Sequence, residues 1–354
     1  MVTSILFNQT KKSNYHFILI YLIVVKFNTP ESEDIQSQIN QLEHKYNLVS
    51  NADIQLSKAE NYFYNCQYQL SYEITSRIIK EDPYNYKVMC IHISSLVELK
   101  LKNELYYCSH KLVELFPNTS ISWYAVASYY YLVGNFENSR RYFSKCTTID
   151  SQFGSGWLAF GHTFALQSEH DQAMSAYRTA ARILPEAHLP LLYIAMELIR
   201  VNNFNLAEQY LFQSKDKCSR DPLIYNELGV ISYKNKEYSK SIQYFSQALD
   251  LLPNNNANNH KSSGNNEIKE VTLVNMAHSF RKLKQYNEAI KYYTLCMTIS
   301  TNNSSIYVAM GFTYQLQGQF MDAIDCYHKC LALKPEDSFA TDCLTQCLEL
   351  ISYS

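Results

Sequence analysis

The sequence is poor in glycine and proline, with only eight of each among 354 residues. This scarcity suits a helical array with short turns. It also lacks an excess of charge of one sign, because 31 Lys and Arg face 33 Asp and Glu, for a net charge of −2. With neither a basic stripe nor an acidic tail, the chain is not expected to bind nucleic acid or to carry a solvating tail.

An apolar run long enough to cross a bilayer is also missing near the N-terminus. The run Phe17–Val25 is about half the length that a span needs. Lys11 and Lys12 precede it, as in a signal peptide, but no small-residue cleavage site follows. We expect no membrane association, and we treat residues 1–51 as an N-terminal segment without an assigned structure.

Catalytic motifs are absent as well. There is no glycine-rich phosphate loop, no GxSxG elbow and no HExxH sequence. The most tempting polar cluster is Glu169–His170–Asp171, which falls in a predicted turn. We interpret these residues as capping and inter-repeat hydrogen-bonding groups, with Asp171 as the cap of the following helix. The chain is therefore not expected to be an enzyme or to need a cofactor.

Ten cysteines are present, yet their spacing does not indicate a metal site. Cys326 and Cys330 are four residues apart, but a closed zinc site needs four converging ligands. Cys146, Cys296 and Cys330 take positions that hold alanine in sister segments. We interpret them as small buried hydrophobes in a reducing compartment.

One stretch of 34 residues, Gly154–Ala187, organises the rest of the sequence. Its large and small residues are spaced by three and four, which predicts two helices that each carry one apolar stripe. The large residues are Trp157, Phe160, Phe164 and Tyr177, and the small ones are Gly161, Ala173 and Ala180. With Pro185 closing the unit, this is the pattern of a tetratricopeptide (TPR) repeat.

The pattern recurs in phase, and one such unit cannot bury its apolar face alone. Repeats are predicted to start at residues 52, 86, 120, 154, 188, 222, 270 and 304. The repeats at 52 and 86 are degenerate. The first has Gln55 and Lys58 where bulky apolar residues are usual, and the second has Leu105 and Ser109 where alanine and an aromatic residue are usual. The predicted fold is an all-α, right-handed TPR superhelix, an α-solenoid of helix-turn-helix repeats.

The domain boundaries follow from this phase. Six repeats cover residues 52–253, an Asn-rich insert covers 254–269, and two repeats cover 270–337. The insert has too few apolar residues to order itself, so we predict it to be disordered. Residues 338–354 form a capping helix and tail, with one face made of Phe339, Cys343, Leu344, Cys347 and Leu350.

The first helix of each TPR pair lines the concave side of the superhelix. Aromatic and basic groups there suit an extended or helical peptide. The predicted partner-binding residues are Tyr193, Met196, Arg200, Asn226, Tyr233, Asn275, His278 and Arg281. A carboxylate clamp of the co-chaperone type is disfavoured, because Val230 stands at the partner position of Asn226.

Several segments resemble one family of TPR proteins. They include SWYAVASYYYLVGN (122–135), WLAFGHTFALQSEHDQAMSAYRTAARI (157–183) and RKLKQYNEAIKYY (281–293). These segments are similar to subunit 6 of the anaphase-promoting complex, the cell-division-cycle TPR subunit of that ubiquitin ligase. The SEHDQAM sequence is specific, because the TPR consensus fixes neither Glu169 nor His170.

The resemblance implies a non-catalytic scaffold found in the nucleus and cytoplasm. Family members enclose the N-terminal segment of a very small partner subunit in their C-terminal superhelix, and they stack on neighbouring TPR subunits. They also pair as homodimers through N-terminal repeats. Those repeats precede the part that matches here, so we interpret the chain as N-terminally truncated and do not assume a homodimer.

Two other classes of function remain open at this point. The chain could be a generic TPR adaptor or co-chaperone that captures peptides. It could also be an enzyme with a TPR targeting arm, although the sequence leaves no residues for a catalytic domain.

Overall fold

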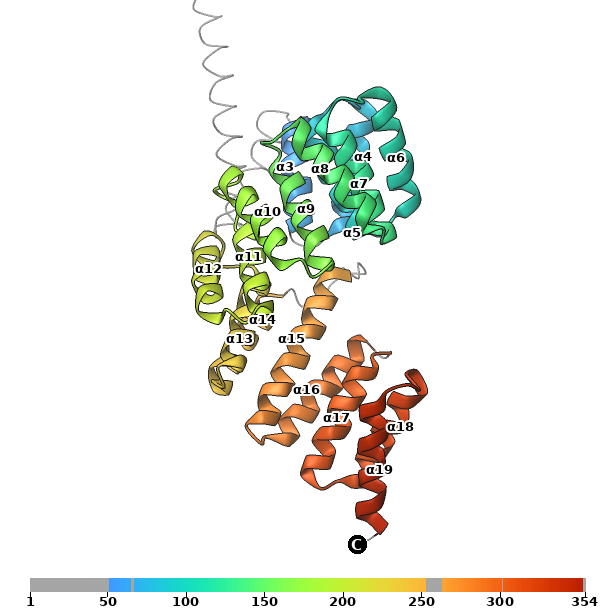
Figure 1. The fold of residues 1–354 in the computed structure, drawn as a ribbon, viewed down its shortest axis with the longest axis vertical. Coiled ribbons are helices and arrows are strands. Elements are labelled where there is room, and N and C mark those ends of the chain that lie inside the picture. Colours follow the sequence, from blue (N-terminus) through green and yellow to red (C-terminus); the bar gives the residue numbers. More distant parts are fainter. Residues whose placement is uncertain (1–50, 65–66, 253–262, 301, 353–354) are drawn as a thin grey trace, which may run out of the picture. The chain divides into compact units, whose positions relative to one another are not determined.

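The structure is a computed structural model that describes residues 51–64, 67–252, 263–300 and 302–352 (Figure 1). Every regular element in this part of the chain is an α-helix, which confirms the predicted all-α array of TPR repeats. The helices fall into two compact units, one ending at Arg220 and the other beginning at Asp221. The predicted N-terminal segment 1–51 lies outside the described residues, apart from its last position.

The described part of unit 1 contains five helix pairs, and neighbouring pairs within the unit pack on one another (Figure 1). The pairs are α3 (Ala52–Tyr64) with α4 (Tyr68–Glu81), α5 (Tyr86–Glu98) with α6 (Lys102–Leu115), α7 (Ser120–Val133) with α8 (Phe136–Ile149), α9 (Gly154–Leu166) with α10 (His170–Ile183), and α11 (Leu189–Arg200) with α12 (Phe204–Lys217).

Unit 2 contains three further pairs and a closing helix. They are α13 (Pro222–Lys234) with α14 (Tyr238–Leu251), α15 (Ser263–Lys282) with α16 (Tyr286–Ile299), α17 (Ser304–Gln317) with α18 (Phe320–Leu333), and α19 (Ser338–Ser352). In both units the first helices begin on or next to the predicted repeat starts, except for α15.

The predicted end of the Asn-rich insert at residue 269 is wrong. Helix α15 begins at Ser263, so the last part of the predicted insert is helical. These residues carry little apolar periodicity, but extending a helix that already exists adds one hydrogen bond per residue fixed. Residues 253–262 of the predicted insert lie outside the described part of the chain.

Small residues allow the two helices of a regular repeat to approach closely. A Cβ atom on Gly161 would lie 2.3 Å from the Tyr177 ring, and one on Gly229 would lie 2.5 Å from the Phe245 ring. Gly311 has the same relationship to Tyr327, at 2.9 Å. These glycines therefore occupy equivalent helix-crossing points, as the 34-residue phase requires.

The second repeat of unit 1 departs from this rule. Ile93 stands at the position of Gly161, and Leu105 stands at the position of Ala173. Both side chains are fully buried, so they hold α5 and α6 apart. Helix α6 packs mainly on α7 instead of on its own partner. The degenerate sequence thus produces a splayed hairpin.

Hydroxyl groups connect successive repeats. They lie at the interface between the second helix of one repeat and the first helix of the next, which we call the seam. Ser71 and Ser95 are 3.2 Å apart, and Ser241 and Ser279 are 2.7 Å apart, with all four side chains fully buried. Ser139 and Thr163 make the equivalent contact at 3.5 Å. A hydrogen bond depends on angle as well as distance, so these bonds help to fix the orientation of neighbouring repeats at seams that are otherwise apolar.

A left-handed residue marks the turn inside every hairpin whose turn lies wholly within the described residues. It is glycine at Gly134 (φ 87°) and Gly318 (φ 82°), where an L side chain would be strained. At the other turns a residue with a side chain adopts the same left-handed conformation, at Lys100, Ser168, Asn202, Lys236 and Lys284.

The closing helix α19 covers the last repeat, but its buried face differs from the prediction. Cys343 and Cys347 are buried as expected, together with Ala340. Phe339 is 50% exposed and Leu350 is 49% exposed, so these two are wrongly assigned to the buried face. The smaller Ala340 replaces Phe339 because the helix lies close to Tyr327 and Cys330.

Candidate partner-binding groove

The first helices of unit 1 line a cavity of about 460 Å³, which we name the unit 1 groove. Most of its wall comes from the first helices α3, α5, α7, α9 and α11, and Phe143 of α8 and Phe153 before α9 complete it, so the cavity runs across five consecutive repeats. The lining residues include Tyr86, Cys90, Ser94, Tyr124, Ser128, Tyr131, Ser155, Leu158, His162, Leu189 and Tyr193.

The groove combines aromatic rings with hydroxyl groups that already have partners. The Tyr86 hydroxyl lies 2.9 Å from the hydroxyl of Ser120, and the Tyr124 hydroxyl lies 3.1 Å from that of Ser94. Rings with satisfied hydroxyls give an amphipathic wall at low conformational cost. Such a wall suits the apolar side chains and the backbone of a bound polypeptide.

Few charges enter this cavity. Burial raises the pKa of Glu60 to about 7, against the opposing effect of the nearby Lys87 charge. Burial also raises the pKa of the Cys90 thiol to about 11 and lowers the pKa of His162 to about 4. At neutral pH the thiol and the imidazole are therefore both uncharged, so the Cys90 thiol is not activated as a nucleophile.

Of the predicted partner-binding residues in unit 1, the groove includes Tyr193. Its ring stacks on Tyr177 with centroids 5.6 Å apart and meets the edge of His162 at 4.4 Å. Arg200 lies at the end of α11 with 47% of its side chain exposed, and it pairs with Glu197 at 2.7 Å. Met196 is half-buried on the same helix and does not line the cavity.

The other predicted residues lie in unit 2, where two of them are joined by a hydrogen bond. The Asn275 amide donates to the Asn226 side-chain carbonyl at 3.3 Å, and the Asn226 amide donates to Glu227 at 3.0 Å. Asn226 is also only 3% exposed. Its amide is thus committed to neighbours inside the unit and is poorly placed for a carboxylate clamp.

His278 and Arg281 in unit 2 also have partners inside the repeat stack. The Nδ1 atom of His278 lies 2.6 Å from the Tyr293 hydroxyl, and burial lowers the pKa of this histidine to about 4. The Arg281 guanidinium lies 5.2 Å from the centre of the Phe312 ring. Tyr233 is half-buried, and burial raises the pKa of its hydroxyl.

The sequence prediction placed the binding residues from repeat 188 onward and missed the earlier part of the groove. Cys90 and Tyr124 stand at the repeat position of Asn226, and Ser94, Ser128 and His162 stand at that of His278. The 34-residue phase could have found them. What it could not show is where side-chain sizes leave open space.

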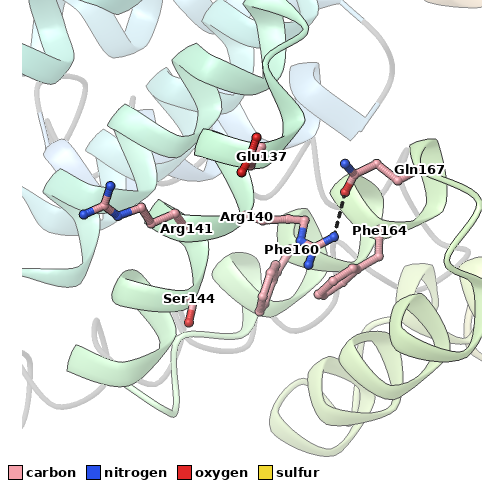
Figure 2. Close-up of a pocket in the computed structure, with 7 residues that line it drawn as sticks. All are labelled: Glu137, Arg140, Arg141, Ser144, Phe160, Phe164 and Gln167. Carbon is pink, nitrogen blue, oxygen red and sulfur yellow. Dashed lines mark hydrogen bonds between the residues drawn. The ribbon is translucent and has the colours of Figure 1, made fainter.

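Figure 2 shows a second pocket in unit 1, of about 540 Å³, lined by residues of α8 and α9. Arg140 lies over the Phe164 ring at 5.0 Å and donates to Gln167 at 3.2 Å and to Glu169 at 2.7 Å. Arg141 points away from Phe160 and Phe164 in this view (Figure 2). We assign no ligand to this pocket, because the arginine inside it is already paired.

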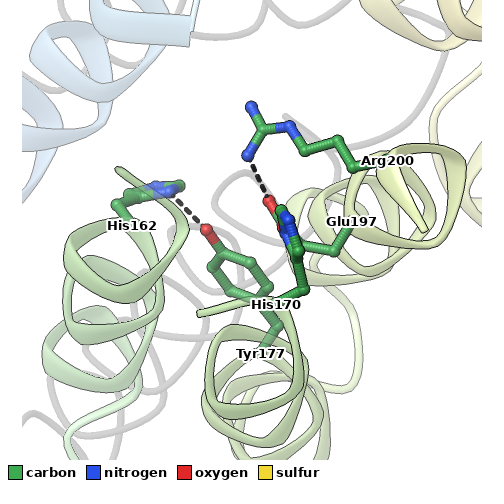
Figure 3. A network of polar contacts seen from close by, with 5 residues as sticks. All are labelled: His162, His170, Tyr177, Glu197 and Arg200. Atoms are coloured by element: carbon green, nitrogen blue, oxygen red, sulfur yellow. Dashed lines mark hydrogen bonds and ion pairs between the residues drawn. The ribbon is translucent and has the colours of Figure 1, made fainter. Parts of the chain in front are cut away.

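The polar cluster of the SEHDQAM sequence takes part in contacts between repeats. Glu169 pairs with Arg140, and His170 pairs with Glu197 at 2.7 Å (Figure 3). These contacts agree with the inter-repeat interpretation of the cluster. The prediction that Asp171 caps the helix is wrong, because α10 begins at His170 and Asp171 lies within its first turn.

Comparison with known proteins places this architecture in a family. Residues 121–153, 222–255, 272–303 and 304–337 match the tetratricopeptide repeat. Anaphase-promoting complex subunit 6 of Arabidopsis thaliana is 44% identical over 85% of this chain and 54% of its own length. Over most of its length, the chain is similar to the anaphase-promoting complex subunit 6 family.

A second curated relative and a solved structure show the same similarity. The subunit 6 of Dictyostelium discoideum is 40% identical over 88% of this chain and 46% of its own length. The crystal structure of the APC/C hetero-tetramer Cut9-Hcn1 superimposes with a TM-score of 0.81 at 34% identity, covering 93% of this chain and 62% of that one. The chain thus spans about half the length of the curated relatives it matches.

Proposed function

We propose that this chain is a non-catalytic TPR scaffold of the anaphase-promoting complex, and that the unit 1 groove holds an extended segment of a small partner subunit. The groove is the observation that carries the proposal, because it is an amphipathic cavity bounded by five first helices. The Cut9 relative was solved together with Hcn1, which supports a partner of that kind. Neighbouring TPR subunits of the complex are the other proposed partners.

The chemistry of the groove supports a binding role over a catalytic one. The Cys90 thiol and the His162 imidazole are both neutral at pH 7, and the hydroxyls of Tyr86 and Tyr124 are bonded to serines. Ubiquitin transfer is then left to other subunits of the complex. In keeping with this role, the protein is proposed to occur in both the nucleus and the cytoplasm, which imaging of the tagged chain tests.

The test compares two serine-to-arginine variants in affinity purification from native cells. Ser155 lines the groove, whereas Ser175 is exposed on α10 outside it. The wild type and Ser175→Arg are expected to recover the cullin and RING subunits together with a small subunit. Ser155→Arg is expected to lose the small subunit.

Two outcomes contradict the proposal. Recovery of no cullin or RING subunit by the wild type would refute membership of the ligase. Equal recovery of the small subunit by both arginine variants would refute the groove as its binding site. A wild-type sample dominated by heat-shock proteins would favour the co-chaperone class instead.

A further inference from the structure

Two adjacent residues in unit 1 reach in opposite directions along the repeat array. Glu169 and His170 lie at the turn between α9 and α10, in the middle of three consecutive hairpins. Glu169 contacts the hairpin before it, and His170 contacts the hairpin after it. Neither residue lines the unit 1 groove.

The contact of Glu169 with the preceding hairpin, called the backward contact, fixes the position of Arg140 on α8. The Arg140 Nη1 atom lies 2.7 Å from Glu169 Oε1 and 3.2 Å from Gln167 Oε1. The same guanidinium covers the face of Phe164 at 5.0 Å. A guanidinium held on two oxygens and one ring has a defined orientation, which a purely apolar contact does not give.

The contact of His170 with the following hairpin, called the forward contact, is made to a buried carboxylate. Glu197 is 2% exposed, and its two oxygens lie 2.7 Å from His170 Nδ1 and 2.7 Å from Arg200 Nη1 (Figure 3). At the equivalent position, four other repeats carry a small hydroxyl residue, and the remaining three carry Asn61, Tyr129 and Ile231. None of the other predicted repeats has an acidic residue there, so the costly burial of the Glu197 carboxylate calls for a separate explanation.

The forward contact is connected to the wall of the groove. Tyr193 lies one helical turn before Glu197 on α11, and it lines the groove. Its ring stacks on Tyr177 of α10 and meets His162 of α9. Tyr177 is bonded in turn to His162, with 2.8 Å between the hydroxyl and Nδ1 (Figure 3). A shift of α11 relative to α10 would therefore displace one wall of the cavity.

We propose that Glu169 and His170 are positioning residues: together they clamp the hairpins α7–α8, α9–α10 and α11–α12 at the spacing that forms the unit 1 groove. The curvature of a solenoid is set by a small rotation at each repeat, so two directional contacts at one turn can fix it over three repeats. Partner affinity then depends on residues that never touch the partner. This inference rests on the proposed function of the groove.

The experiment uses the full chain, with purified Hcn1 as the binding probe and calorimetry as the readout. Glu169→Ala and His170→Ala are each expected to weaken binding by at least about fivefold, the low end of usual coupling between sites. Asp171→Ala is the matched control on the same turn and is expected to leave affinity unchanged. Arg140→Glu combined with Glu169→Arg is expected to restore affinity, and so is His170→Gln, which keeps a donor for Glu197.

Small-angle scattering of the free proteins distinguishes a failure of the clamp hypothesis from a failure of the proposed function of the groove. The two alanine variants are expected to change the scattering profile without losing helix content, and the charge swap is expected to restore it. Wild-type affinity and scattering in both alanine variants would overturn the clamp. Altered scattering with no Hcn1 binding by the wild type would instead overturn the proposed role of the groove.

Discussion

The Nδ1 atom of His162 lies 2.8 Å from the hydroxyl of Tyr177, and this pair links the concave face to the core of its repeat. His278 and Tyr293 make the same contact at 2.6 Å in unit 2. Both tyrosines are almost fully buried, so each hydroxyl needs a partner inside the repeat. The histidine on the concave side supplies it.

These histidines predict a stability that falls in mild acid. Their pKa values are lowered from 6.5 to about 4 by burial, so below pH 6.5 the unfolded chain binds protons that the folded chain does not. Stability is therefore full above pH 6.5 and is lost as the pH falls towards 4. On the order of 1–2 kcal/mol per histidine is expected to be lost by pH 5.

Chemical denaturation between pH 7.5 and 5 measures this effect. The variant His162→Gln/His278→Gln is expected to show a weaker dependence on pH, because glutamine can accept the tyrosine hydrogen bond without titrating. Gln315 already does so for Tyr327, at 2.8 Å. An identical pH profile in the variant and the wild type would exclude these two residues as the cause.

Replacing Gly161 with leucine tests the packing of the fourth repeat. The Tyr177 ring occupies the space that the new side chain would enter, since even a Cβ atom would approach it to 2.3 Å. Overpacking of this kind is expected to lower the free energy of unfolding by about 1–3 kcal/mol. Thermal melting is the measurement, with Ser175→Leu on the exposed side of α10 as the control. An unchanged melting temperature would contradict the assigned register.

The left-handed turns predict a substitution that stabilises the protein. Lys236 adopts φ 67° between α13 and α14, a conformation in which a side chain is strained and glycine is not. Lys236→Gly is expected to raise the free energy of unfolding by about 1 kcal/mol. Gln243→Gly, at an exposed position inside α14, is expected to lower it by about 1 kcal/mol. Equal effects of the two glycines would show that the turn is not strained.

The splayed hairpin predicts that a more regular sequence is not a more stable one. Leu105 is fully buried, and truncating it to alanine restores the small residue of a regular repeat but leaves a void beside Ile93. We expect Leu105→Ala to cost about 2–5 kcal/mol in urea unfolding. Leu115→Ala is the control, because that side chain is 49% exposed. A cost below that of the control would mean that α5 and α6 close the gap.

Much of this architecture could be predicted from the sequence because the signal recurs. The crossing points at Gly161, Gly229 and Gly311 follow from one spacing repeated along the chain, and a single weak position does not disturb it. The start of α15 at Ser263 could not be found in this way, since helix extension needs no apolar pattern. Asp171 was misplaced for a related reason, because helix ends depend on backbone geometry within one or two residues.

The groove was harder to predict than the fold. Concave positions can be counted in any repeat, but open space depends on which side chains meet there. Ile93 and Leu105 spread one hairpin, and this effect has no counterpart in the repeat consensus. The contacts of Glu169 and His170 were expected to join repeats, yet their opposite directions required coordinates.

The buried hydroxyl pairs at the seams have a consequence for building with these repeats. Sliding one hairpin by a single position would break the hydrogen bond between Ser241 and Ser279 and leave both hydroxyls unpaired in an apolar environment. The loss of folding free energy would be comparable to that of a lost core contact. A hairpin transplanted from this chain into another array would thus need a matching hydroxyl across each new junction. The hydroxyl pairs between repeats therefore restrict which hairpins can pack next to one another in a continuous stack.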